Sequence, residues 1–89
     1  MIIELNKFGT TLTSRQDGKE AYNAFLSTLR AVPDNEKIKI DFAGVVTFTP
    51  SWADEFITPI LAAYSNRVKL IHTDNPSVEA TLRLLAKIK

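Results

Sequence analysis

Alternating apolar and polar residues mark the clearest strand of this chain. Residues 38–42 read Ile-Lys-Ile-Asp-Phe, which predicts a strand with one buried face and one face at least partly exposed to water. Residues 68–71 predict a second such strand, and residues 2–5 an opening strand. After Gly9, residues 10–12 predict a short strand that closes a hairpin with the first.

Apolar residues at helical spacing predict three helices between and after these strands. The first follows Thr13 or Ser14, either of which can cap a helix, and ends before Pro33. The second begins at Thr49-Pro50-Ser51, a cap followed by a proline that fits the first helical position. The third follows Asp74-Asn75-Pro76, which repeats this signal. The expected buried stripes are Ala21, Tyr22, Phe25, Leu26 and Leu29; Ala53, Phe56, Ile57, Ile60, Leu61 and Tyr64; and Val78, Leu82, Leu85 and Ile88.

The order of these elements predicts an α/β fold. Strands separated by helices favour right-handed crossovers and partly parallel pairing, and the opening hairpin adds an antiparallel part. We therefore expect a small mixed sheet of about four strands, in the order β-β-α-β-α-β-α, with helices mainly on one face. Residues 1–89 are expected to form a single domain. Pro59 lies inside the second helix and predicts a kink near residues 55–59 or a break into two shorter helices.

Composition narrows the class of protein. Apolar residues make up 45% of the chain, and there is no cysteine, which excludes disulfides and thiolate metal sites. The first residues lack the apolar run of a secretory signal or a membrane span, so we expect a cytoplasmic protein with no membrane partner. The net charge is +1; residues 67–89 hold five basic and two acidic residues, net +3. This basic end lacks the interleaved aromatics that nucleic-acid binding favours, so no nucleic-acid partner is expected.

The inventory of reactive side chains argues against an enzyme. His72 is the only histidine and is expected to be structural or partly exposed, and no glycine-rich phosphate loop is present. Ser51 has no base paired with it in the sequence. Asp54 and Glu55 are adjacent, so on a helix their side chains diverge by about 100°. We therefore expect no catalytic residue, no metal and no cofactor.

Residues 41–55 are the most informative segment. A strand ends, a loop turns, and a helix begins with the hydroxyls of Thr49 and Ser51 at its N-terminus, where free N–H groups and the helix dipole attract anions. A phosphate on Ser51 would be favoured by that dipole and opposed by the nearby Asp54 and Glu55. Trp52 would be an interface anchor if exposed and a plug for the end of a thin core if buried, and its size favours burial.

This segment resembles the STAS domain (sulfate transporter and anti-sigma-factor antagonist). In that family a strand ends in Asp-Leu/Phe-x-Gly-Val, an apolar pair follows, and a helix begins Asp-Ser-Ser-Gly. Residues 41–45, Asp-Phe-Ala-Gly-Val, match the first part, and Ser51 lies where anti-sigma-factor antagonists carry their phosphorylated serine. Pro50, Trp52 and Ala53 depart from the family's aspartate, second serine and glycine.

The chain is still more similar to the STAS-like family of unknown function. Residues 52–55, Trp-Ala-Asp-Glu, resemble the helix start of that family, in which a bulky residue precedes a small residue, Asp and Glu. Upstream, Gly9, Leu12 and Ser14-Arg15 also resemble the family. The resemblance implies a non-catalytic regulatory module that binds a protein partner. The resemblance to anti-sigma-factor antagonists suggests a histidine-kinase-like ATPase as that partner.

Arg15 stands at a helix start, where the dipole disfavours a cation, so a tertiary partner is expected in Asp41 or in residues 52–55. The leading hypothesis places a partner-binding surface at residues 44–55. The candidate contact residues are Arg15, Thr49, Ser51, Trp52, Asp54 and Glu55. Two alternatives stay open: a phosphoacceptor switch at Ser51, and binding of a small anion or nucleotide at the second helix N-terminus. A homodimer through a sheet edge is a further possibility.

Overall fold

The computed structural model describes residues 1–88, which form three α-helices, five short strands and two 3₁₀-helices. The strands are β1 (Ile2–Glu4), β2 (Thr11–Leu12), β3 (Ile38–Asp41), β4 (Thr47–Phe48) and β5 (Val68–Ile71). The helices are α1 (Arg15–Arg30), α2 (Pro50–Tyr64) and α3 (Pro76–Ile88), with the 3₁₀-helices η1 (Leu5–Phe8) and η2 (Ser65–Arg67).

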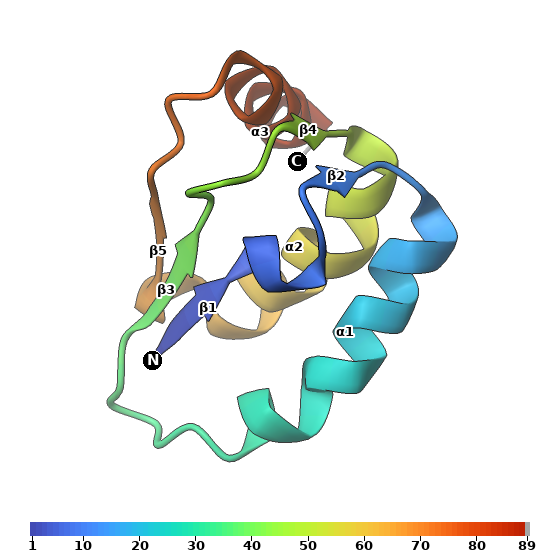
Figure 1. Cartoon of the computed structure of the whole chain (residues 1–89). Helices are drawn as coiled ribbons and strands as arrows, with labels where there is room; N and C mark the ends of the chain where they lie inside the picture. The colour runs from blue at the N-terminus through green and yellow to red at the C-terminus, as the bar shows by residue number, and fades with distance from the viewer. Residues whose placement is uncertain (89) are drawn as a thin grey trace.

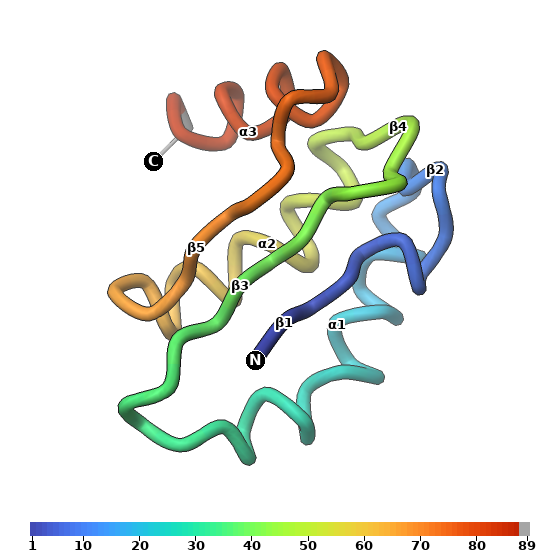
Figure 2. Tube along the Cα trace, turned by 60° about the vertical axis from the view of Figure 1, so that its left-hand side comes forward, coloured from blue at the N-terminus to red at the C-terminus, as the bar shows by residue number. Residues whose placement is uncertain are grey.

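Three strands form a parallel sheet in the order β1-β3-β5 (Figure 2). Ile3, Ile40 and Leu70 are aligned across it. Each of its connections passes through a helix, as the crossover rule requires for parallel strands. A second, two-stranded parallel sheet pairs β2 with β4.

The predicted opening hairpin is wrong, and with it the mixed sheet of about four strands. The 3₁₀-helix η1 follows β1 directly, and Gly9 takes φ +129°, so the chain leaves the first sheet instead of folding back. β2 then pairs with β4, where Thr10 accepts hydrogen bonds from the backbone N–H groups of Val46 and Thr47. The observed architecture is an α/β fold with parallel strands in two small sheets.

The helices lie mainly on one face of the three-stranded sheet. Ile38 and Ile40 are completely buried, whereas Lys39 between them is exposed, and Ile2 on β1 is 58% exposed. α1 packs along α2 beneath the buried face, and α3 packs against α2 and β4 beyond the ends of the strands (Figure 1). The opposite face of the sheet is uncovered by any element of residues 1–88.

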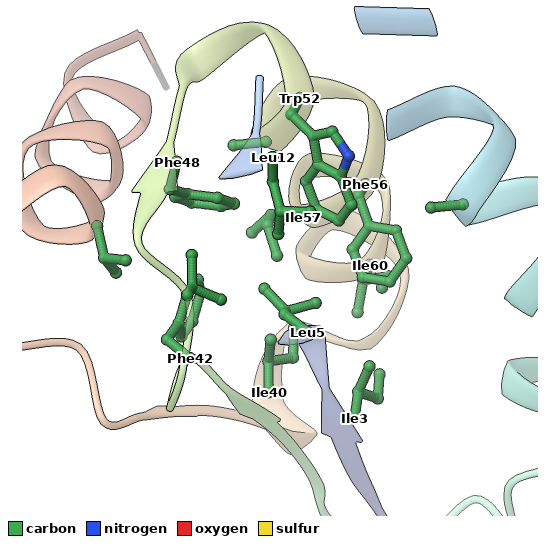
Figure 3. Packing of buried hydrophobic residues seen from close by; sticks show 14 of the residues in the cluster. Ile3, Leu5, Leu12, Ile40, Phe42, Phe48, Trp52, Phe56, Ile57 and Ile60 are labelled. Atoms are coloured by element: carbon green, nitrogen blue, oxygen red, sulfur yellow. The ribbon is translucent and has the colours of Figure 1, made fainter. Parts of the chain in front are cut away.

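Aromatic rings fill the core where α2 meets the strands (Figure 3). Trp52 stacks on Phe56 one helical turn later, with 4.9 Å between the ring centroids, and Phe48 lies 5.9 Å from Trp52. All three side chains are at most 2% exposed. The start of α2 is therefore fixed by its own buried face.

Two further predictions about the helices meet different outcomes. α2 runs without a break from Pro50 to Tyr64, so of the two alternatives predicted from Pro59 the break into two helices is wrong, and the kink near residues 55–59 stays a prediction. The completely buried neighbours Phe56, Ile57 and Ile60 hold the helix together across the missing hydrogen bond. Ser14 caps α1 as expected, accepting a hydrogen bond from the Asp17 N–H at 3.0 Å.

Candidate functional site

The candidate site is the loop and helix start at residues 41–55, beginning with a tight turn. The Asp41 carboxylate accepts a hydrogen bond from the Ala43 N–H at 2.9 Å, and the Val45 N–H donates to the Phe42 carbonyl at 3.1 Å. Gly44 takes φ +84°, a backbone angle that this kind of turn requires and that residues other than glycine rarely adopt. This geometry explains why the strand ends in the pattern Asp-Phe-x-Gly.

The loop after the turn is held from two sides. The Val46 N–H donates to the Thr10 carbonyl at 2.8 Å. The Asn75 side-chain amide donates to the carbonyls of Val45 and Val46 at 3.0 and 3.2 Å. Val45 is 4% exposed and Val46 is 62% exposed, so the two side chains point in opposite directions. An apolar side chain is thus presented to solvent on a rigidly anchored loop.

The start of α2 carries two hydroxyl groups with different environments. Thr49 occupies the N-cap position, but its hydroxyl donates to the Thr13 carbonyl at 2.7 Å and does not cap the helix. Ser51 is half-buried, and no residue among 1–88 hydrogen-bonds to its hydroxyl. Within residues 1–88, no side-chain acceptor therefore caps the first N–H groups of α2.

Arg15 joins the starts of α1 and α2. A single guanidinium nitrogen lies 3.0 Å from the Asp54 carboxylate and 2.6 Å from the Glu55 carboxylate. Hydrogen bonding to Asp54 first, and then to Glu55, raises the pKa of Arg15 above its ordinary value. Its side chain is 56% exposed, so the contact adds little to stability and acts mainly by fixing three charges in one geometry. The expectation that Arg15 has a partner among residues 52–55 is confirmed.

Trp52 must be removed from the set of contact residues. Its side chain is 1% exposed and stacks in the aromatic core, as the preferred interpretation of the sequence held. Lying four residues before Phe56, it shares the buried face of α2. The exposed apolar residue of the segment is Val46, which sequence reasoning missed. The signal for it is the pair Val45-Val46 in a short loop, where only one of two successive side chains can point inward.

A hollow of about 230 Å³ opens beside this segment, and Asp17 and Glu20 of α1 contribute to its lining together with Phe8, Thr11, Leu12 and Ala21. Buried Trp52 also contributes to its wall. The negative charges of Asp17 and Glu20 extend the acidic character of Asp54 and Glu55 along the neighbouring helix. Four carboxylates therefore lie around the two helix starts, and Arg15 bridges two of them.

His72 directly follows the last residue of β5 and contacts Asp41 at the start of the turn. Its Nδ1 is 2.7 Å from the same Asp41 oxygen that accepts the Ala43 N–H. The Ala43 hydrogen bond, and then His72, hold the pKa of Asp41 below its ordinary value. His72 has φ +56°, and among residues 1–88 it is the one non-glycine residue with a positive φ. Its side chain is 62% exposed, in line with the expectation of a partly exposed residue.

Other kinds of site have no support within the described part of the chain. Residues 1–88 contain no group of three or more His, Cys, Asp or Glu side chains placed to hold a metal ion. In the same range, no helix has the length and apolar character needed to span a membrane.

Comparison with known protein families decides the relationship. Residues 17–78 match the model of the STAS-like domain of unknown function (DUF4325). The chain belongs to this family. The match covers more than half of this STAS-like protein and includes the whole turn, loop and start of α2 described above. No curated protein and no solved structure matches it.

Proposed function

We propose that this STAS-like protein is a non-catalytic regulatory module that binds a protein partner through its loop and second helix start. We call this region the docking surface and define it by Arg15, Val46, Thr49, Ser51, Asp54 and Glu55. The observation that carries the proposal is the exposure of Val46 on a loop fixed by Thr10 and Asn75.

Protein interfaces commonly have an apolar centre and a polar rim. On the docking surface, Val46 supplies an apolar contact, and Asp54 and Glu55 supply charge in a geometry set by Arg15. A surface that is already ordered loses little conformational entropy on binding, which favours affinity. The partner we propose is a histidine-kinase-like ATPase, as the resemblance to anti-sigma-factor antagonists implies, and its contact region should be basic.

The experiment compares a docking variant with a matched control. The docking variant combines Val46→Asp with Asp54→Lys. The control combines Leu84→Asp with Glu79→Lys on exposed positions of α3, so it too changes one aliphatic residue to Asp and one acidic residue to Lys. Each tagged protein is expressed in its native cells, cross-linked and analysed by quantitative mass spectrometry. A partner retained by the wild type and the control, and reduced at least tenfold by the docking variant, supports the proposal. Equal recovery by both folded variants contradicts it.

A phosphoacceptor role for Ser51 is the second candidate. Ser51 is half-buried and its hydroxyl lacks a hydrogen-bond partner among the described residues, and the helix dipole at the start of α2 favours a phosphate. Arg15 offsets the opposing charges of Asp54 and Glu55. Intact mass of the protein purified from native cells should then show a phosphate that Ser51→Ala removes. A mass that never includes phosphate, across growth and stress conditions, excludes this candidate.

A further inference from the structure

The uncovered face of the three-stranded sheet brings like charges together. Side chains that point away from the core form two rows across the strands. In the first row, Lys39 and Lys69 are direct neighbours in the pairing of β3 with β5, and Ile2 lies beside Lys39. Like charges placed opposite each other on a sheet destabilise it. The second row contains Glu4, Asp41 and Ile71.

A hollow of about 340 Å³ opens at the basic end of this face. It is lined by Lys37, Lys39, Asn66, Arg67, Val68 and Lys69. These residues precede or open β3 and β5, so the hollow lies at the opposite end of these strands from the turn at Asp41. Four cationic side chains thus contribute to the lining of one open hollow, whose surface consists largely of their aliphatic stems and Val68. Its volume falls within the range of about 300–1,000 Å³ typical of small-molecule sites.

The described residues supply no paired counter-charge to these cations. Within residues 1–88, no carboxylate lies within 4.0 Å of the charged nitrogens of Lys37, Lys39, Arg67 or Lys69. The acidic groups nearby are engaged elsewhere. Glu4 pairs with Lys7 at 3.2 Å, and Glu36 with the Met1 amino group at 2.8 Å.

Asp41, in the second row, is likewise engaged, by the Ala43 N–H and His72. Within the described part of the chain, the acidic groups of this face are therefore engaged, whereas its cations have no carboxylate partner.

Arg67 is held in place before any ligand arrives. Its guanidinium donates a hydrogen bond to the Pro33 carbonyl and lies over the ring of Tyr64, 5.1 Å from the ring centroid. A guanidinium has five N–H donors, so others remain for a ligand after the Pro33 bond is made. One fixed, forked donor beside three flexible ammonium groups suits a ligand with several phosphate oxygens.

We propose that this hollow is a binding site for a triphosphate group, carried by a nucleotide or by an inorganic oligophosphate. The cluster of four cations, their lack of carboxylate partners among residues 1–88 and the volume of the hollow all favour a compact, multiply charged anion. The two rows of this face hold no aromatic side chain on which a nucleic-acid base could stack, which disfavours a single-stranded RNA ligand. The site is separate from the docking surface and does not depend on it.

The test measures binding of inorganic tripolyphosphate to the full chain by calorimetry at low salt. Saturable binding near one to one is expected for the wild type, and Lys39→Gln combined with Lys69→Gln should weaken it at least tenfold. The control, Lys19→Gln combined with Lys87→Gln, removes the same charge from exposed positions of α1 and α3 and should change affinity less than threefold. Absence of saturable binding to the wild type, or equal weakening by the control, overturns the proposal.

Further measurements distinguish a nucleotide from an inorganic oligophosphate, and the proposed hollow from other binding sites. ATP bound at least tenfold more tightly than tripolyphosphate identifies a nucleotide, and equal affinity identifies an oligophosphate. If Ser51→Glu abolishes binding while the Lys39 and Lys69 variant retains it, the anion lies at the start of α2 and the proposal is wrong. Tighter binding of a single-stranded RNA oligomer at the same lysines also contradicts it. Thermal melting provides a folding check, because loss of the Lys39–Lys69 repulsion should leave the melting temperature equal or higher.

Discussion

Gly18 of α1 lies directly against the backbone of Trp52 in α2. A Cβ atom added to Gly18 would lie 2.6 Å from the Trp52 carbonyl oxygen and 3.0 Å from its Cα atom. The two helices therefore cross at a distance that only glycine permits. This crossing brings Arg15, one turn earlier in α1, within reach of Asp54 and Glu55.

The substitution Gly18→Ala tests this contact by the sign of its effect. Helix propensity alone would stabilise the protein by about 1 kcal/mol. The clash with helical backbone is expected to outweigh it and to lower the free energy of unfolding by about 1–3 kcal/mol. Urea denaturation measures the difference, with Asn23→Ala on the exposed face of α1 as the control. A net stabilisation by Gly18→Ala would show that the helices separate easily.

Trp52 should behave as a core residue and not as a contact residue. Truncation to alanine removes a buried ring stacked on Phe56 and is expected to cost about 3–5 kcal/mol. Trp52→Phe keeps the stacking position and should remain folded, with partner recovery close to that of the wild type. Selective loss of partner binding by Trp52→Phe, at unchanged stability, would contradict the burial of this side chain.

Val45 and Val46 provide a matched pair of substitutions. Val45→Ala removes buried methyl groups and is expected to lower the free energy of unfolding by about 2 kcal/mol. Val46→Ala removes the same atoms from an exposed position and should change it by less than about 0.5 kcal/mol. Chemical denaturation of both variants measures the contrast. Equal losses would mean that Val46 packs against the protein in solution.

Asp41 should make stability depend on pH in the acidic range. Because its pKa is lowered in the folded protein, the unfolded chain binds more protons between that value and the ordinary pKa of about 3.9. The stabilisation is present above about pH 4–5 and is lost as the pH falls through the lowered pKa. Asp41→Asn should cost about 1 kcal/mol at pH 7, and this difference should shrink on acidification.

The control for this measurement is Asp34→Asn, which makes the same chemical change at an exposed position in the turn before β3. Denaturation curves are collected between pH 7 and pH 2 for both variants and the wild type. A cost of Asp41→Asn that stays constant over this range would show that the Ala43 and His72 contacts do not favour the charged carboxylate.

Local patterns predicted the main strands and the helix starts well. Alternation gave the buried and exposed faces of residues 38–41, and the cap-then-proline signal placed the starts of α2 and α3. The unfavourable position of Arg15 led to its partners in α2. In each case the physical cause lies within a few residues, where the sequence displays it.

The incorrect or missing predictions concern features that contacts between distant parts of the sequence determine. The strand Thr11–Leu12 has only two residues, which is too short for its hydrophobic pattern to specify a partner strand. Its parallel pairing with β4 depends on the change of chain direction at η1, which the sequence analysis did not predict. The break predicted at Pro59 did not occur because burial on one helix face holds α2 together. Exposure of Val46 and the basic hollow likewise required knowledge of which elements meet.

Asn75 links the last helix to the loop that displays Val46. Its carbonyl oxygen accepts the N–H groups of Ser77 and Val78 at 2.7 and 3.2 Å, while its amide nitrogen holds the Val45 and Val46 carbonyls. One side chain thus serves two segments that are 30 residues apart. In amide hydrogen exchange, the loop and the first turn of α3 should therefore open together as one cooperative unit. A ligand that detaches the start of the final helix would leave the loop anchored by Thr10 alone, so the C-terminal segment influences how firmly the exposed Val46 is held.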